Sequence, residues 1–190
     1  MRLFLVARHG QSLFNVDKVV NGDPALDRGL SEQGIEEGAR LAGQIAALPL
    51  DLVAVSPFPR ALQTANIALA GREVPHLLDD DLGDVRIGDL EGKTLDAYRE
   101  APAHSNRKKC FPGGESLDEA ALRYADACER LLARHEATTL VHTGVHTPYE
   151  KLAALPAALR ARMRLVHYPD DFDLASSVIE PLHQGRSYDV

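Results

Sequence analysis

The sequence lacks several features that would place it in a specialised class of protein. It has only two cysteines, Cys110 and Cys128, and their spacing does not match a metal site, so we expect a protein of the reducing cytoplasm. Its first apolar run, residues 3–7, is far too short for the core of a signal peptide or for a membrane span, and no other run approaches that length. The sequence also has no internal repeat and no low-complexity tract. We therefore expect no membrane partner.

A surplus of positive charge is also missing, since the formal net charge is −7 at pH 7. No overall field would attract nucleic acid or an anionic membrane, so any anionic ligand must be bound by a local cationic pocket. The apolar share of 45% and the charged share of 26% are those of an ordinary globular protein. The length of 190 residues predicts a single domain, residues 1–190, and no pattern in the sequence indicates an oligomeric state.

Short apolar runs alternate with helical patterns along the chain. This alternation predicts an α/β fold, a three-layer α/β/α sandwich around a mostly parallel central sheet. The strands are expected at residues 3–7, 52–56, 139–142 and 177–182, with a weaker one at 74–77.

Residues that favour helix N-termini mark where the helices are expected to begin. Ser31 precedes one helix, Pro59 suits the first turn of another, and Ser116 with Glu119 forms a capping box that opens a third. The stretch 99–115, with its prolines, glycines and basic residues, is expected to be one long loop of the kind that forms lids or substrate walls. The first helix is expected to present one apolar face made of Ile35, Ala39, Ala42, Ile45 and Ala46.

Side chains that can bind phosphate follow three of the expected strands where each strand ends. Arg8 and His9 follow the first, Arg60 lies one helical turn beyond the second, and His142 with Thr143 ends the third. Ligands of doubly wound sheets bind outside the carboxyl ends of the strands. We therefore expect two arginines and two histidines to converge on one crevice, beside a loop that is rich in carboxylates.

This set of side chains suits phosphoryl transfer. Two guanidinium groups bind the non-bridging oxygens of a phosphate and offset the charge that develops in the transition state. A neutral imidazole attacks phosphorus and forms a phosphohistidine. A carboxylic acid with a raised pKa protonates the leaving oxygen, a step typically worth about 10²–10⁴-fold in rate. Because the arginines supply the electrostatic stabilisation, no metal or other cofactor is required.

Six segments, in order along the chain, resemble a known family. The sequence is similar to the histidine phosphatase superfamily, in its phosphoglycerate-mutase-like branch, over nearly its whole length. The resemblance implies the phosphoglycerate-mutase-like fold and a small phosphorylated substrate. The matching segments are "RHGQSLFN" (8–15), "LSEQG" (30–34), "SPFPRALQTA" (56–65), "GDLEGKT" (88–94), "FPGGES" (111–116) and "VHTGV" (141–145).

The resemblance also implies roles for individual residues. His9 is then the phosphorylated nucleophile, and Arg8, Arg60 and His142 complete the phosphate pocket. The substrate-binding set that the resemblance implies is Arg8, Asn15, Asn21, Gly22, Arg60, His142 and Thr143.

The proton donor in this family is a carboxylic acid four residues before the first glycine of the segment that "GDLEGKT" matches. That position is Asp84 in this sequence, where many members have a glutamate and other branches of the superfamily have an aspartate. Glu91, inside the same segment, is the alternative donor.

Two segments that look like other motifs are rejected. "GDLEGKT" has too few residues between its first glycine and "GK" for a phosphate-binding P-loop, and its carboxylates would repel a triphosphate. His142 and His146 have the spacing of zinc ligands on a helix, but no glutamate follows His142, and Gly144 and Pro148 interrupt the segment. We therefore expect no metal site.

Three functions are compatible with the sequence. The first is a metal-independent phosphomonoesterase that acts through a phosphohistidine at His9. The second is a phosphoglycerate mutase, although mutases carry a longer insertion than the residues 95–110 that separate "EGKT" from "FPGGES", which favours the phosphatase. The third is a phosphate-binding module with little catalysis, because Asp84 stands where many members have a glutamate.

Overall fold

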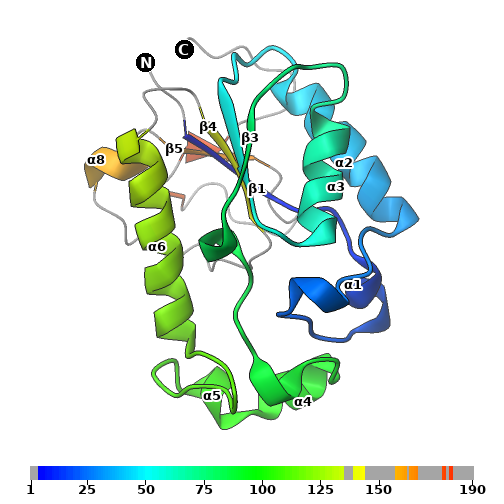
Figure 1. Cartoon of the computed structure of the whole chain (residues 1–190), viewed down its shortest axis with the longest axis vertical. Coiled ribbons are helices and arrows are strands. Elements are labelled where there is room, and N and C mark those ends of the chain that lie inside the picture. Colours follow the sequence, from blue (N-terminus) through cyan, green and yellow to red (C-terminus); the bar gives the residue numbers. More distant parts are fainter. Residues whose placement is uncertain are drawn as a thin grey trace.

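A parallel β-sheet lies at the centre of the molecule (Figure 1). The computed structural model describes residues 4–134, 139–143, 157–161, 163–166, 177–178 and 180–181. Every strand pair in this part of the chain is parallel, and the strand order is β3-β2-β4-β1-β5-β6. The strands are β1 (Phe4–Arg8), β2 (Leu52–Val55), β3 (His76–Leu78), β4 (Thr139–Thr143), β5 (Met163–Val166) and β6 (Glu180–Pro181).

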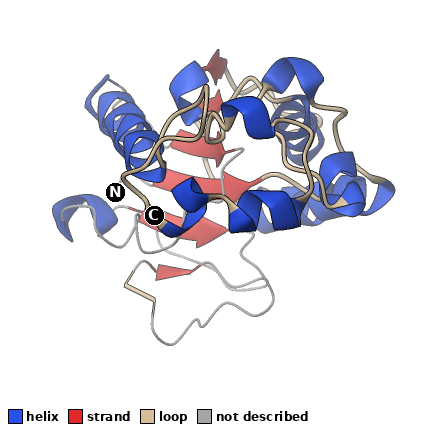
Figure 2. Cartoon of the chain, turned by 90° about the horizontal axis from the view of Figure 1, so that it is seen from below, coloured by secondary structure: helices blue, strands red, loops and turns tan. Residues whose placement is uncertain are grey.

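Helices cover the two faces of the sheet, so the expected α/β/α sandwich is confirmed. Figures 1 and 2 show α2 and α3 on one side of the strands and α6 on the other. Among the helices described, none combines the length and the apolar character that a membrane crossing requires. The helices are α1 (Leu13–Asp17), η1 (Pro24–Leu26), α2 (Glu32–Ile45), α3 (Pro59–Ala68), η2 (Asp80–Leu82), η3 (Gly88–Leu90), α4 (Leu95–Glu100), α5 (Pro102–Ser105), α6 (Leu117–Arg134) and α8 (Ala157–Arg160).

The expected helix starts are confirmed in detail. The hydroxyl of Ser31 accepts a hydrogen bond from the backbone N–H of Gly34 at 3.1 Å and so caps α2. At the start of α6, Ser116 and Glu119 each bind the backbone N–H of the other, at 3.1 and 2.8 Å. Pro59 occupies the first turn of α3.

The buried face of α2 differs from the predicted one. A Cβ at Gly34 would lie 2.1 Å from the carbonyl oxygen of Gln11, so the glycine lets the first turn of the helix approach the chain that follows β1. Ile35, which the apolar pattern placed in the core, is 51% exposed. Ile45 is buried as predicted, but Ala39 and Ala46 are exposed like Ile35, because the prediction counted apolar side chains and gave no weight to buried glycines. The residues that α2 buries are Gly34, Gly38, Leu41 and Ile45.

The stretch 99–115 is not the single long loop that was predicted, because α5 lies within it. Proline at the first position of α5 favours the start of a helix. The ring of Tyr98 packs edge-on against His104, with 4.9 Å between centroids, and stacks on Phe111 at 5.2 Å. These aromatic contacts fold the stretch back on itself beside a small apolar cluster that contains Ile87 and Phe111.

The strand predictions are confirmed most closely beside the site. The structure places β1, β2 and β4 within one residue of the predicted bounds at each end. β6 is a short part of the predicted strand 177–182, of which residues 179 and 182 lie outside the described part of the chain. β5 has no counterpart among the predicted strands, because Arg164 interrupts its apolar run.

Candidate active site

His9 lies directly after β1 and is almost completely buried, with 4% of its surface exposed. Its Nδ1 lies 2.6 Å from the carbonyl oxygen of Gly10. Because a carbonyl oxygen only accepts hydrogen bonds, Nδ1 carries the proton of the neutral ring and Nε2 keeps its lone pair. Nε2 accepts a hydrogen bond from Nε of Arg60 at 3.2 Å. The imidazole therefore directs a nucleophilic nitrogen at a guanidinium group.

Arg60 lies in the first turn of α3, and its side chain is only 4% exposed. Its Nη1 donates to Oδ1 of Asn21 at 2.7 Å, and its Nη2 donates to Oδ2 of Asp84 at 3.1 Å. The Cζ atom lies 4.1 Å from the centre of the Phe58 ring. One planar group thus joins His9, the loop that contains Asn21 and the loop that follows η2.

Asp84 presents its carboxyl group to this guanidinium, with 20% of the side chain exposed. Its Oδ1 accepts a hydrogen bond from the backbone N–H of Val85 at 2.8 Å. Burial raises the pKa of Asp84, and the charges of Arg60, Arg8 and Arg123 and the Val85 N–H oppose that rise. A carboxyl group in this setting can retain a proton at a pH where an exposed aspartate has lost it, as a general acid must.

Arg8 ends β1 and belongs to the same electrostatic group. Burial lowers the pKa of Arg8, while the charges of Asp84 and Glu37 raise it and the charge of Arg60 lowers it further. Arginine remains protonated in proteins even so. Two guanidinium groups and one carboxyl group therefore interact beside His9, which is a favourable setting for a phosphate dianion.

The backbone of β4 brings His142 and Thr143 to the same edge of the sheet. His142 is the register partner of Ala7 in β1 and of Val55 in β2, and Thr143 is the partner of Arg8. The expected meeting of the strand ends is confirmed for the backbone. The other histidine of the rejected zinc pair, His146, lies outside the described residues.

Glu91, the alternative proton donor, binds the backbone of another loop. Its carboxylate accepts hydrogen bonds from the N–H groups of Gly22, at 2.9 Å for Oε2, and of Asp23, at 3.0 Å. The side-chain amide of Asn21 lies 3.4 Å from Oε1. Burial raises the pKa of Glu91, and these hydrogen bonds oppose the rise. The carboxylate of Glu91 thus orders the 21–23 loop, in which Asn21 accepts from Arg60.

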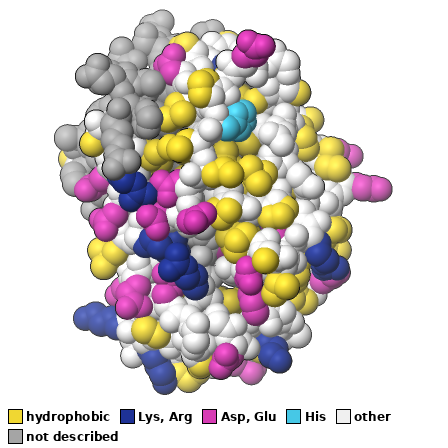
Figure 3. All heavy atoms as spheres, viewed as in Figure 1, with side chains coloured by type: hydrophobic (Ala, Val, Ile, Leu, Met, Phe, Trp, Pro, Cys, Tyr) yellow, Lys and Arg dark blue, Asp and Glu magenta, His cyan; other side chains and the backbone are white. Residues whose placement is uncertain are grey.

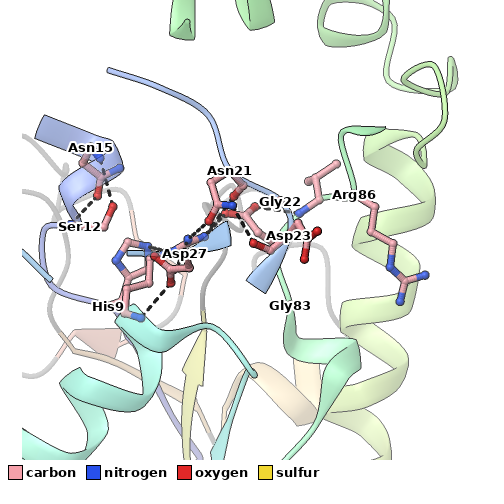
Figure 4. A network of polar contacts seen from close by, with 12 residues as sticks. His9, Ser12, Asn15, Asn21, Gly22, Asp23, Asp27, Gly83 and Arg86 are labelled. Atoms are coloured by element: carbon pink, nitrogen blue, oxygen red, sulfur yellow. Dashed lines mark hydrogen bonds and ion pairs between the residues drawn. The ribbon is translucent and has the colours of Figure 1, made fainter. Parts of the chain in front are cut away.

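Two of the predicted substrate residues make other contacts in this structure. Asn15 is exposed and forms a capping box with Ser12 at the start of α1, where its Oδ1 accepts from the Ser12 N–H at 3.0 Å. Figure 4 shows this pair beside the network that joins His9 to Asn21 and not within it. The N–H of Gly22 is bound by Glu91. Of the predicted set, Asn21 is thus the loop residue that contacts the His9–Arg60 pair through Arg60.

Asp27 and Thr64 support the site, although the sequence analysis assigned them no role. The Asp27 carboxylate, fully buried, accepts from the backbone N–H of Arg60 at 2.9 Å and lies 3.4 Å from its Nη1. The Thr64 hydroxyl donates to the carbonyl of Arg60 at 2.7 Å and accepts from the N–H of Gly10 at 3.0 Å. Thr64 lies one turn after Arg60 inside "SPFPRALQTA", so helical spacing is a signal that could have identified it.

Comparison with known proteins identifies the family. The model of the Histidine phosphatase superfamily (branch 1) matches residues 4–164. The chain is 30% identical to the bifunctional protein Rv2228c of Mycobacterium tuberculosis, over 96% of this chain and 51% of that protein. It is 27% identical to the probable phosphoglycerate mutase GpmB of Erwinia tasmaniensis, over 87% of this chain and 80% of that one.

Solved structures confirm the phosphoglycerate-mutase-like fold that the resemblance implied. The mycobacterial glucosyl-3-phosphoglycerate phosphatase Rv2419c, in complex with VO3, is similar with a TM-score of 0.65 and 27% identity, over 82% of this chain and 80% of that one. The chain spans about half the length of the bifunctional protein Rv2228c, of which it covers 51%.

Proposed function

We propose that this chain, which belongs to the histidine phosphatase superfamily (branch 1), is a metal-independent phosphomonoesterase. Its substrate in this proposal is a small phosphorylated metabolite, and the reaction passes through a phosphohistidine at His9. The observation that carries the proposal is the position of Arg60, whose guanidinium contacts Nε2 of His9 at 3.2 Å and the Asp84 carboxylate at 3.1 Å. A phosphate bound to that guanidinium would have a nucleophile and an acid within reach.

In the first half of the proposed reaction, Arg8, Arg60 and His142 bind the phosphate. The lone pair of His9 Nε2 attacks phosphorus, and the bond between phosphorus and the ester oxygen breaks. The carboxyl group of Asp84 gives its proton to the departing oxygen. The guanidinium groups offset the negative charge on the equatorial oxygens, which is the contribution that a metal ion supplies in other phosphotransferases.

In the second half, the Asp84 carboxylate accepts a proton from water while the water oxygen attacks phosphorus. The bond between phosphorus and Nε2 breaks, inorganic phosphate leaves, and both His9 and Asp84 return to their starting protonation states. The contact between Nδ1 and the Gly10 carbonyl keeps the same tautomer throughout, since it stabilises the proton on the nitrogen that does not react.

The direct test is hydrolysis of p-nitrophenyl phosphate and of an alkyl phosphate in the presence of EDTA. We expect the wild-type protein to release phosphate from both, and His9→Ala to release none from either. A phosphoryl group trapped on the wild-type protein by denaturation at alkaline pH, where phosphohistidine is stable, and absent from His9→Ala, would identify the intermediate. Appreciable hydrolysis by His9→Ala would overturn the mechanism.

A mutase is the second candidate, because one relative is named a probable phosphoglycerate mutase. The first half of the reaction is then the same, but a hydroxyl group of the bound product takes the phosphoryl group in place of water. Incubation with 3-phosphoglycerate distinguishes the two functions. A phosphatase releases inorganic phosphate, whereas a mutase produces the isomer and little free phosphate.

A further inference from the structure

Arg123, on α6, binds the backbone of the segment that ends at Asp84. Its Nη1 donates to the carbonyl oxygens of Asp81 at 2.7 Å and Gly83 at 3.1 Å, and its Nη2 donates to that of Asp84 at 3.1 Å. The side chain is 12% exposed, so these hydrogen bonds are largely shielded from water. A single buried guanidinium therefore contacts three carbonyls next to the acid of the proposed reaction.

Glu115 fixes this guanidinium from the other side. Its carboxylate accepts from Nη2 of Arg123 at 2.5 Å and from Nε at 3.2 Å, which is the paired geometry that orients an arginine most strongly. The same carboxylate accepts from the backbone N–H of Arg86 at 2.9 Å. The chain is thus bound just before and just after Asp84, by an ion pair that lies outside the His9–Arg60 cluster.

We propose that Arg123, oriented by Glu115, is a positioning residue that sets the carboxyl group of Asp84 against the leaving oxygen of the substrate. The inference rests on the proposed function, in which Asp84 is the proton donor. The segment needs such support because η2 is a single short turn, with Leu82 N–H bound to Asp79 and Gly83 N–H to Asp80. A displacement of about 1 Å at a reacting group can cost about 10²-fold in rate.

Arg130 provides a matched control, because it lies on the same helix and binds the same segment by different groups. Its Nη2 contacts the side chains of Asp79 at 2.7 Å and Asp81 at 3.0 Å. Its side chain is 32% exposed, and Figure 3 shows acidic and basic side chains side by side on this face of the molecule. Arg130 therefore binds the beginning of the segment and makes no contact with Asp84 among the hydrogen bonds described here.

The test compares two esters whose leaving groups differ in their need for a proton. p-Nitrophenolate leaves readily without protonation, whereas an alkoxide from glycerol 1-phosphate requires it. We expect Arg123→Gln to lower kcat for glycerol 1-phosphate by about 10–100-fold and to change kcat for p-nitrophenyl phosphate by less than about threefold. Arg130→Gln should affect both esters equally and weakly. In an Asp84→Asn background, Arg123→Gln should cause no further loss, because the group it positions is gone.

Each departure from this pattern has a definite meaning. If Arg123→Gln slows both esters equally, Arg123 supports only the fold and the inference fails. If Asp84→Asn discriminates between the esters and Arg123→Gln does not, the inference fails while the proposed function stands. If Asp84→Asn itself does not discriminate, the donor assignment fails and the inference with it.

A second variant covers the case in which Arg123→Gln does not fold. Arg123→Lys keeps the charge but reaches fewer carbonyls, because an ammonium group lacks the planar fork of a guanidinium. We expect the same discrimination between the esters at a smaller size. If a folded Arg123→Lys protein loses the same factor in kcat with both esters, relative to the wild-type protein, the inference is overturned.

Discussion

Two segments bring carboxylates close to His9 and Arg60: Asp84 contacts Arg60 itself, and Glu91 binds the loop whose Asn21 contacts Arg60. The two segments are held in place in different ways. The segment 79–84 is bound by arginine side chains from α6. The segment 88–94 is bound by backbone groups: the N–H of Asp89 donates to Pro112 at 2.8 Å, and that of Gly92 donates to Val20 at 3.1 Å. The first segment therefore depends on individual side chains and the second on the path of the backbone.

The carboxylates themselves also differ, although burial raises the pKa of both. Glu91 accepts hydrogen bonds from the backbone N–H groups of Gly22 and Asp23, which stabilise its ionised form. Asp84 uses Oδ2 to contact the Arg60 guanidinium, a partner that an incoming phosphate would also bind. The comparison teaches that the partners of a buried carboxylate, and not its residue type, decide whether it can serve as a proton donor or as part of the scaffold.

The largest expected effect is that of Asp84→Asn on turnover. An amide cannot donate the proton that an alkoxide needs, so kcat with an alkyl phosphate should fall by about 10²–10⁴-fold. The loss with p-nitrophenyl phosphate should be smaller. Steady-state kinetics of Asp84→Asn and Glu91→Gln with the same two esters check this, and a larger loss of kcat in Glu91→Gln would reverse the roles assigned to the two carboxylates.

Gly88→Ala should destabilise the segment 88–94, which is held by backbone hydrogen bonds. Gly88 has φ of +54°, and a Cβ there would lie 2.1 Å from the carbonyl oxygen of Pro112. We expect the free energy of unfolding to fall by at least about 1–3 kcal/mol, measured by urea denaturation. Arg130→Gln, which removes a side chain of α6 that binds the segment 79–84, should cost at most about 1 kcal/mol because its ion pair is partly exposed. Equal losses in the two variants would contradict the distinction between the segments.

The effect of Glu91→Gln should be more modest and should appear in KM. A carboxamide offers one acceptor oxygen to the N–H groups of Gly22 and Asp23, which now bind both carboxylate oxygens. If the hydrogen bonds become weaker by about 1.4 kcal/mol, KM should rise about tenfold, with kcat nearly unchanged. A fall in kcat that is selective for the alkyl ester would instead identify Glu91 as a proton donor.

Much of the sheet and of the site is predictable from the sequence, for a local reason. Apolar runs end where Arg8 and His142 begin, and parallel strands bring such ends to one edge. The family resemblance at "GDLEGKT" implied a role for Asp84, whose contact with Arg60 the structure then shows. Capping residues such as Ser116 identify helix starts because the interaction lies within four residues.

The parts that could not be predicted depend on contacts between distant residues. Asp27 binds Arg60 from a loop far from it in sequence, and Arg123 binds the Asp84 segment across the gap between α6 and η2. Neither pairing leaves a periodic signal in a single sequence. The buried face of α2 was predicted only at Ile45, since Gly34 is buried for the close approach of Gln11 and not for an apolar side chain.

The smallest expected effect is that of Asp84→Asn on stability. The substitution should lower kcat but raise the free energy of unfolding. Because burial raises the pKa of Asp84, the folded protein binds a proton there more tightly than the unfolded chain does. The stabilisation that comes from this proton is fully present below the pKa that Asp84 has in the unfolded chain. It is lost as the pH rises through the pKa that Asp84 has in the folded protein. Above the pKa of Asp84 in the folded protein, the ionised carboxylate should therefore reduce the free energy of unfolding, and Asp84→Asn should increase it.

Urea denaturation of the wild-type protein and Asp84→Asn from acid to neutral pH checks this sign. The gain from Asp84→Asn should grow as the pH rises, because the asparagine stays neutral while the wild-type carboxyl group ionises. Asp80→Asn, which changes an exposed carboxylate in the same segment, controls for the loss of one charge. A less stable Asp84→Asn protein at neutral pH would mean that the ion pair with Arg60 outweighs the burial of the carboxylate.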